Sequence, residues 1–67
     1  MKLKIVFVGF DKKEEILEVN GQKYSEILES LGINPETVVI VKDGLPVPTD
    51  EVAEGGEVKV VRVISGG

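Results

Sequence analysis

The two ends of the chain carry alternating patterns of hydrophobic and polar residues. Every second position in residues 3–7 is large and apolar, namely Leu3, Ile5 and Phe7. Residues 57–64 alternate in the same way, with Val58 and Val60 on one side. A period of two is typical of a β-strand that is buried on one face. We expect these two strands to lie side by side at the centre of a sheet, with their apolar side chains beneath a helix.

A second strand and a helix are predicted between these ends. A polar turn that begins at Gly9 precedes residues 14–19, which we expect to return antiparallel to the first strand. The following segment has the i, i+3, i+4, i+7 spacing of one helical face, at Tyr24, Ile27, Leu28 and Leu31. Gly32 is placed to end this helix. The helix should therefore lie across the sheet.

The next segment predicts two further strands. Residues 34–36 form a turn signal, and the β-branched run at 37–41 is typical of a strand buried in the middle of a sheet. Asp43 and Gly44 favour a tight turn, and the two prolines in residues 45–48 restrict that segment to a sheet edge or a loop. The resulting order of elements predicts an α+β fold, with a mixed sheet of four to five strands and one main helix across one face.

Composition excludes several classes of function. The 67 residues allow one domain, and the absence of Cys and His removes thiol nucleophiles, typical zinc sites and imidazole catalysis. We therefore expect no catalytic residue and no metal site. A formal charge of −4 disfavours nucleic acid as a partner. No apolar run is long enough to span a bilayer, so we expect a cytoplasmic protein with no membrane partner. We also expect a monomer.

The last three residues, Ser65, Gly66 and Gly67, add little to a fold, because glycine loses much backbone freedom when it is ordered. We therefore expect one domain over residues 1–67, with a folded body over 1–64 and a mobile tail over 65–67. Such a thin tail is suited to a narrow enzyme channel. The alternative interpretation is that two terminal glycines arose by chance.

Three segments carry a resemblance to a known family. Residues 21–31 resemble the Gly-x-Thr-x-x-x-Leu-Leu-x-x-Leu helix entry of thiamine-pathway sulfur carriers. Residues 39–48 are similar to the valine-rich strand, polar pair and proline-containing edge strand of those proteins, and residues 54–67 are similar to their closing strand and tail. The chain thus resembles the ubiquitin-like β-grasp sulfur carriers, a group that includes the molybdopterin-synthase carriers and the archaeal small modifier proteins. Lys23 stands where the family usually has a capping Thr, so we expect Gln22 or Ser25 to supply the helix cap.

The resemblance implies a chemistry at the C-terminus. An E1-like enzyme that holds ATP and magnesium would join the Gly67 carboxylate to AMP. A sulfur donor would then give a terminal thiocarboxylate, which serves a sulfur-acceptor synthase in thiamine, molybdopterin or tRNA thiolation. Attack by a lysine of a target protein would instead give an isopeptide bond. By this resemblance the chain is a carrier that binds no cofactor itself, and it is not an enzyme.

The same resemblance implies which residues meet the partner. Gly66, Ser65 and Ile64 would occupy the enzyme's channel, and four residues of the last strand would form a docking face: Lys59, Val61, Arg62 and Val63. In the alternative interpretation, Val61 and Val63 are ordinary half-buried strand residues.

The function of the chain and the role of its acidic residues each allow a further interpretation. The chain as a whole is also compatible with an interaction module of the β-grasp class, whose terminal glycines are incidental. The acidic residues Glu14, Glu15 and Glu18 suggest a metal cluster or, more simply, a solvated strand face.

Overall fold

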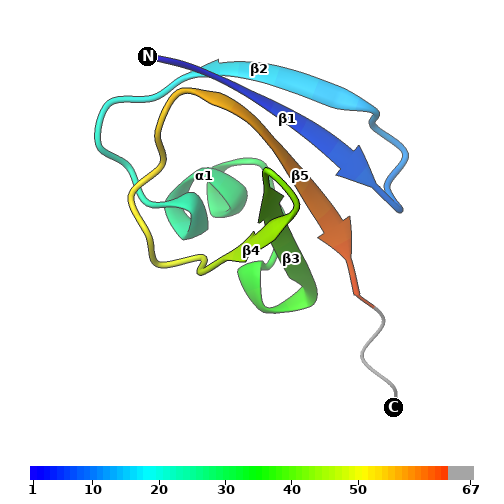
Figure 1. The fold of residues 1–67 in the computed structure, drawn as a ribbon. Coiled ribbons are helices and arrows are strands. Elements are labelled where there is room, and N and C mark those ends of the chain that lie inside the picture. Colours follow the sequence, from blue (N-terminus) through cyan, green and yellow to red (C-terminus); the bar gives the residue numbers. More distant parts are fainter. Residues whose placement is uncertain (64–67) are drawn as a thin grey trace.

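The computed structural model describes residues 1–63 and contains one five-stranded sheet with one α-helix against it (Figure 1). The elements in chain order are β1 (Lys2–Val8), β2 (Glu14–Glu18), α1 (Tyr24–Ser30), the 3-10 helix η1 (Pro35–Thr37), β3 (Val38–Lys42), β4 (Leu45–Val47) and β5 (Gly56–Arg62). The strands lie in the order β2-β1-β5-β3-β4. Strand β1 runs parallel to β5, and the other neighbouring pairs are antiparallel. This arrangement is the expected α+β, ubiquitin-like β-grasp fold.

The core lies between α1 and one face of the sheet. The alternating residues of β1 and β5 point into it, and Ile5 and Val58, which pair across the two strands, are each 1% exposed. Tyr24, Ile27 and Leu28 of the helix cover them. The prediction that the first and last strands meet beneath a helix is therefore confirmed.

The C-terminal end of α1 is closed by Gly32. This residue has a φ of +77°, a backbone conformation that favours glycine. Its N–H donates to the carbonyl oxygen of Glu29 at 3.0 Å, and the N–H of Ile33 donates to that of Leu28 at 2.9 Å. This pair of bonds is the Schellman motif, so the predicted cap at Gly32 is confirmed.

The N-terminal end of α1 differs from the sequence expectation. The Glu26 carboxylate accepts from the N–H of Lys23 at 2.9 Å, whereas Gln22 accepts from Asn20 instead. The first N–H groups of the helix donate to main-chain carbonyls of the loop that precedes β5. Tyr24 donates to Glu51 at 3.0 Å, and Ser25 donates to Thr49 at 2.7 Å. The expectation that Gln22 or Ser25 supplies the cap is therefore wrong, because a distant loop satisfies the helix start.

The prediction that strand β3 is buried in the middle of the sheet is only partly right. The strand lies between the central β5 and the edge strand β4, and only Val38 and Ile40 point into the core. Val39 is 38% exposed on the other face. A run of valines predicts burial on two faces, although the single helix covers only one.

Strand β4 occupies the sheet edge, as its proline predicts. The turn that leads into it has positive φ at Asp43 and Gly44, as a two-residue hairpin requires.

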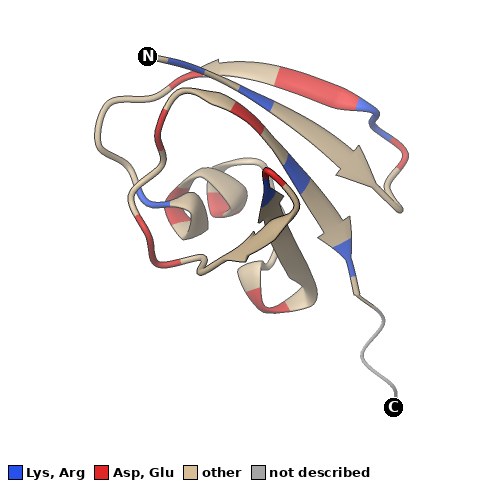
Figure 2. Ribbon diagram, in the orientation of Figure 1, with Lys and Arg blue, Asp and Glu red and all other residues tan. Residues whose placement is uncertain are grey.

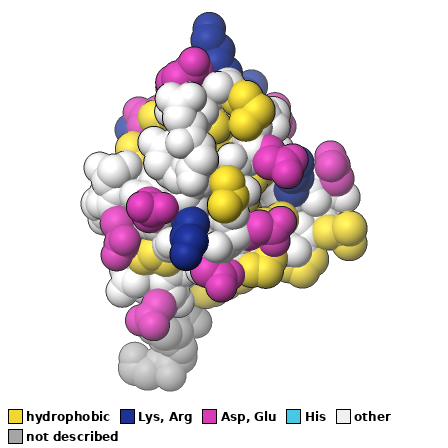
Figure 3. Space-filling view, turned by 90° about the vertical axis from the view of Figure 1, so that its left-hand side faces the viewer, with side chains coloured by type: hydrophobic (Ala, Val, Ile, Leu, Met, Phe, Trp, Pro, Cys, Tyr) yellow, Lys and Arg dark blue, Asp and Glu magenta, His cyan; other side chains and the backbone are white. Residues whose placement is uncertain are grey.

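Charged residues lie along the strands, the helix and the loops, and none of those described is buried (Figure 2). Figure 3 shows the side of the molecule on which α1 lies in Figure 1. Acidic side chains are spread over it among small, separate hydrophobic areas. Within residues 1–63, no helix is long and apolar enough to cross a membrane.

The one-sided core gives a first prediction. Ile5→Ala should lower the free energy of unfolding by about 2–5 kcal/mol, because it leaves a cavity among fully buried neighbours. Ile16→Ala, on the neighbouring strand, should cost less than about 1 kcal/mol, since Ile16 is 62% exposed. Urea unfolding of the two variants measures the difference. Equal losses would contradict the assignment of the two faces.

Candidate functional site

Strand β5 brings the chain to the candidate site. After Arg62, the N–H of Val63 donates to the carbonyl oxygen of Thr37 at 2.9 Å, which fixes the last described residue against the segment that precedes β3. Four predicted site residues lie outside the described residues: Ile64, Ser65, Gly66 and Gly67. The last described residue therefore lies at the end of the central strand β5, beside the segment that precedes β3.

The predicted docking residues fall on the two faces of β5. Lys59 and Val61 point to the face without the helix, whereas Arg62 lies on the helix side. There its guanidinium carbon is 5.1 Å from the centroid of the Phe10 ring. Val63 follows the strand and is 41% exposed. The structure thus brings Lys59 and Val61 together and places Arg62 in a different environment.

The face of the sheet opposite α1 carries a set of valines that we call the valine face. The register pairs Val61 with Val39 on one side and with Val8 on the other. Val8 is 43% exposed and Val61 is half-buried. No described helix packs on this face, so its valines stay partly exposed to water. The valine face comprises Val6, Val8, Val39, Val41 and Val61.

Charged side chains adjoin the valine face. The Lys4 ammonium lies 3.6 Å from the Glu14 carboxylate and 3.8 Å from that of Glu57. Lys59 pairs in register with Val6 and Val41 and is exposed. The face therefore joins an apolar centre to charged neighbours, as transient protein interfaces do. Sequence reasoning found Val61 but missed Val39, whose only signal is the register of β3 against β5.

The three glutamates of β2 do not converge on one point. Glu14 pairs with Lys4, Glu15 with Lys12 at 2.6 Å, and Glu18 with the N-terminal ammonium at 3.8 Å. Alternation along β2 puts Glu15 on the helix side and the other two on the opposite face. No group of three possible metal ligands occurs in the described part of the chain. These residues are solvated partners of nearby cations.

A close backbone approach joins the β1–β2 turn to the end of β5. Gly9 has a φ of +88°, and a Cβ atom added there would lie 3.2 Å from the Cβ of Arg62. Glycine is therefore favoured at this position for two reasons, its backbone conformation and the small space that Arg62 leaves for a side chain. The turn thus lies close to the end of β5, where Phe10 meets Arg62.

The comparisons with known proteins agree on one family. The family model described as "Small archaeal modifier protein 2" matches residues 1–64. Small archaeal modifier protein 2 of Haloferax volcanii is 33% identical over 67 residues, which cover all of both chains. Sulfur carrier protein TtuB of Thermus thermophilus is 46% identical over 64 residues, or 92% of this chain and 97% of that protein. An uncharacterized protein of Archaeoglobus fulgidus is 84% identical over the whole of both chains.

The approach at Gly9 gives a second prediction. Gly9→Ala should cost more stability than Gly44→Ala, although both glycines have positive φ. The left-handed conformation costs roughly 1–2 kcal/mol for either alanine. Only at Gly9 must Arg62 also move, because nothing lies within 4 Å of a Cβ at Gly44. Urea unfolding and the amide NMR shifts of Phe10 and Arg62 provide the measurement. A larger loss for Gly44→Ala would disprove this interpretation.

Proposed function

Because this chain belongs to the small archaeal modifier protein 2 family, we propose that it is a sulfur carrier whose Gly67 carboxylate is activated by an E1-like enzyme. The observation that carries the proposal is the match of nearly the whole folded chain to a family of small ubiquitin-like carriers, together with its Gly66–Gly67 end. The likeness to a sulfur carrier protein of Thermus thermophilus supports sulfur as the cargo.

Activation is needed because a carboxylate is a poor electrophile. In the proposed reaction, a Gly67 carboxylate oxygen attacks the α-phosphorus of ATP, and the bond between the α- and β-phosphates breaks. The products are a C-terminal acyl-adenylate and pyrophosphate. Sulfide sulfur from a donor then attacks the carbonyl carbon, AMP leaves, and a thiocarboxylate remains. The thiocarboxylate is the form that a sulfur-acceptor enzyme in thiamine, molybdopterin or tRNA thiolation would use.

The chain's own part in this reaction is presentation. It has no Cys or His, and its described carboxylates form no convergent cluster, so ATP and magnesium would be held by the partner enzyme. The Val63–Thr37 hydrogen bond holds the end of β5 in a defined place. Only Ile64, Ser65 and Gly66 separate that anchor from the reacting residue. In the proposed reaction, the enzyme binds the folded body and thereby positions the terminal segment.

The valine face is the proposed docking surface for the activating enzyme. It lies on the central strands of the sheet, and Val61 sits two residues before the last described residue. Burying exposed valines contributes roughly 25 cal/mol for each Å² of apolar surface removed from water. Lys59 would add charge complementarity, which raises the rate of association more than the affinity.

A second function, as a protein modifier, is favoured by the relative in Haloferax volcanii, which carries the name of a modifier. The acyl-adenylate is common to both outcomes. Attack by the amine of a target lysine, in place of sulfur, gives an isopeptide bond at Gly67. The choice between the two would be made by the nucleophile that the partner supplies.

Intact-mass spectrometry tests the proposed function directly. The chain, with a free C-terminus, is incubated with its host's E1-like enzyme, ATP, magnesium and a sulfide donor. The expected product is heavier by the difference between one sulfur and one oxygen atom. Deletion of Gly67 should abolish the change. Adducts on other proteins, with no thiocarboxylate, would favour the modifier function, and an unchanged mass beside a demonstrably active enzyme would overturn sulfur transfer to Gly67.

Docking on the valine face gives a further prediction. Val61→Asp should raise the KM for this chain in ATP–pyrophosphate exchange by at least about fivefold, because a charge enters an apolar contact. Val52→Asp makes the same substitution at an exposed valine of the loop before β5 and should change KM less than about twofold. Similar effects of the two variants would refute docking at this face. Circular dichroism checks that each variant is folded.

A further inference from the structure

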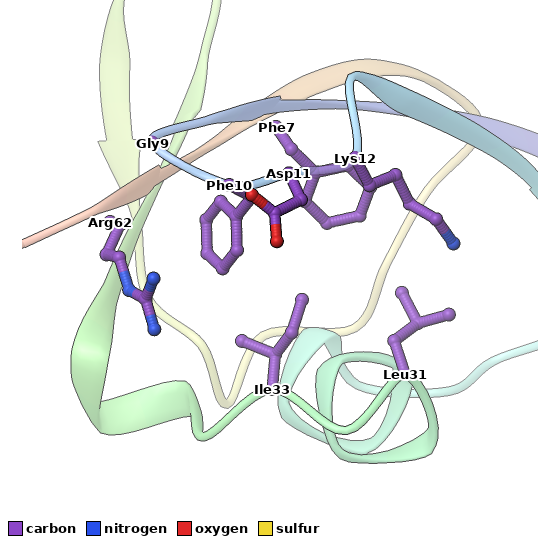
Figure 4. A pocket seen from close by; sticks show the side chains of 8 residues that line it. All are labelled: Phe7, Gly9, Phe10, Asp11, Lys12, Leu31, Ile33 and Arg62. Carbon is purple, nitrogen blue, oxygen red and sulfur yellow. The ribbon is translucent and has the colours of Figure 1, made fainter.

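A pocket of about 360 Å³ lies on the helix side of the sheet, where β5 ends (Figure 4). Three segments that are distant in sequence form it: the end of β1 with the turn that follows, the end of the helix region, and the last residue of β5. Arg62 belongs to its lining, and Val63 follows directly. The pocket and the valine face therefore flank the same strand end from opposite sides.

Four apolar side chains form part of the pocket's lining, beside polar and charged residues. Figure 4 shows the side chains of Leu31 and Ile33 pointing toward the residues of the β1–β2 turn. Across from them, the rings of Phe7 and Phe10 pack edge to face, with centroids 5.5 Å apart and an interplanar angle of 68°. Leu31, Ile33 and Phe10 are only half-buried. Each therefore has surface that an incoming apolar side chain can cover.

Cations stand at the two ends of the pocket, as Figure 4 shows for Arg62 and Lys12. The Lys12 ammonium lies 6.0 Å from the centroid of the Phe7 ring and pairs with Glu15. Arg62 stacks on Phe10 and forms no salt bridge with any residue of the range 1–63. Asp11 is the one acidic residue in the lining. The lining thus has an excess of positive charge in a chain whose formal charge is −4.

We propose that this pocket is a second docking site for the activating enzyme, and that it receives a large apolar side chain flanked by carboxylates. This inference rests on the proposed function. The apolar side chain would cover Ile33, Leu31 and Phe10. A carboxylate beside Arg62 would accept two parallel hydrogen bonds from its planar guanidinium, a geometry that lysine does not offer.

Charge selects this occupant over two others. A basic segment would be repelled at the Arg62 end of the pocket, where no carboxylate of residues 1–63 pairs with the guanidinium. A second copy of this chain carries the same formal net charge of −4, which opposes association of two copies. With the pocket on one side of β5 and the valine face on the other, the enzyme holds the strand end between two contacts.

The test compares four charge reversals in ATP–pyrophosphate exchange with the full chain and its host's E1-like enzyme. Lys12→Glu and Arg62→Glu alter the pocket. Lys13→Glu and Lys23→Glu change the formal charge equally at exposed residues that do not line it. The two pocket variants should raise the KM for this chain about tenfold, as loss of one charge-assisted contact does, with kcat unchanged. The two controls should stay within about twofold of the unmodified chain.

The outcomes separate this proposal from the proposed function. If the unmodified chain supports no exchange, the proposed function fails. If it supports exchange and all four variants have the same KM, whether unchanged or raised, the pocket proposal is overturned while the proposed function stands. Lys12→Gln and Arg62→Gln remove charge without reversing it. Each should raise the KM for this chain, but by less than the Glu variant at the same position. Thermal unfolding of every variant separates lost docking from lost folding.

Discussion

The parallel pairing of β1 with β5 is the constraint on which the rest of the structure depends. It joins Leu3 to Gly56 and continues to Val8 and Val61, so the first and last strands form the middle of the sheet. Since each strand alternates, the pairing aligns two rows of apolar residues on the helix side. The same register aligns Val8 and Val61 on the other side. The core and the valine face are therefore two products of one pairing.

The sequence predicted most of the fold because its patterns are local. The alternation at residues 3–7, the helical spacing from Tyr24 to Leu31 and the cap at Gly32 each depend on neighbours a few residues away. Two details failed because they depend on distant partners. The start of α1 is satisfied by carbonyls of Thr49 and Glu51, and the exposure of Val39 depends on the absence of a second layer over β3 within residues 1–63.

The candidate site was predictable to a smaller extent. Val61 and Lys59 could be placed on one face by alternation alone. The position of Arg62 over Phe10 could not, because it depends on how the β1–β2 turn folds back against β5. Gly9 carried the relevant signal, but a glycine in a turn predicts a conformation rather than the neighbour it approaches. The contacts around the strand end thus depend on the folded chain and not on any local pattern of residues.

The distance in sequence between β1 and β5 also governs how the protein is made. Contacts such as Leu3 with Gly56 close a loop of nearly the whole described chain, and non-local pairing of this kind slows folding. During synthesis, α1 has no complete sheet to pack on until β5 has left the ribosome. A chain interrupted before β5 would expose its apolar strands and lack both proposed docking contacts. The last strand to be made is therefore the one that completes the core and both surfaces beside the terminal segment.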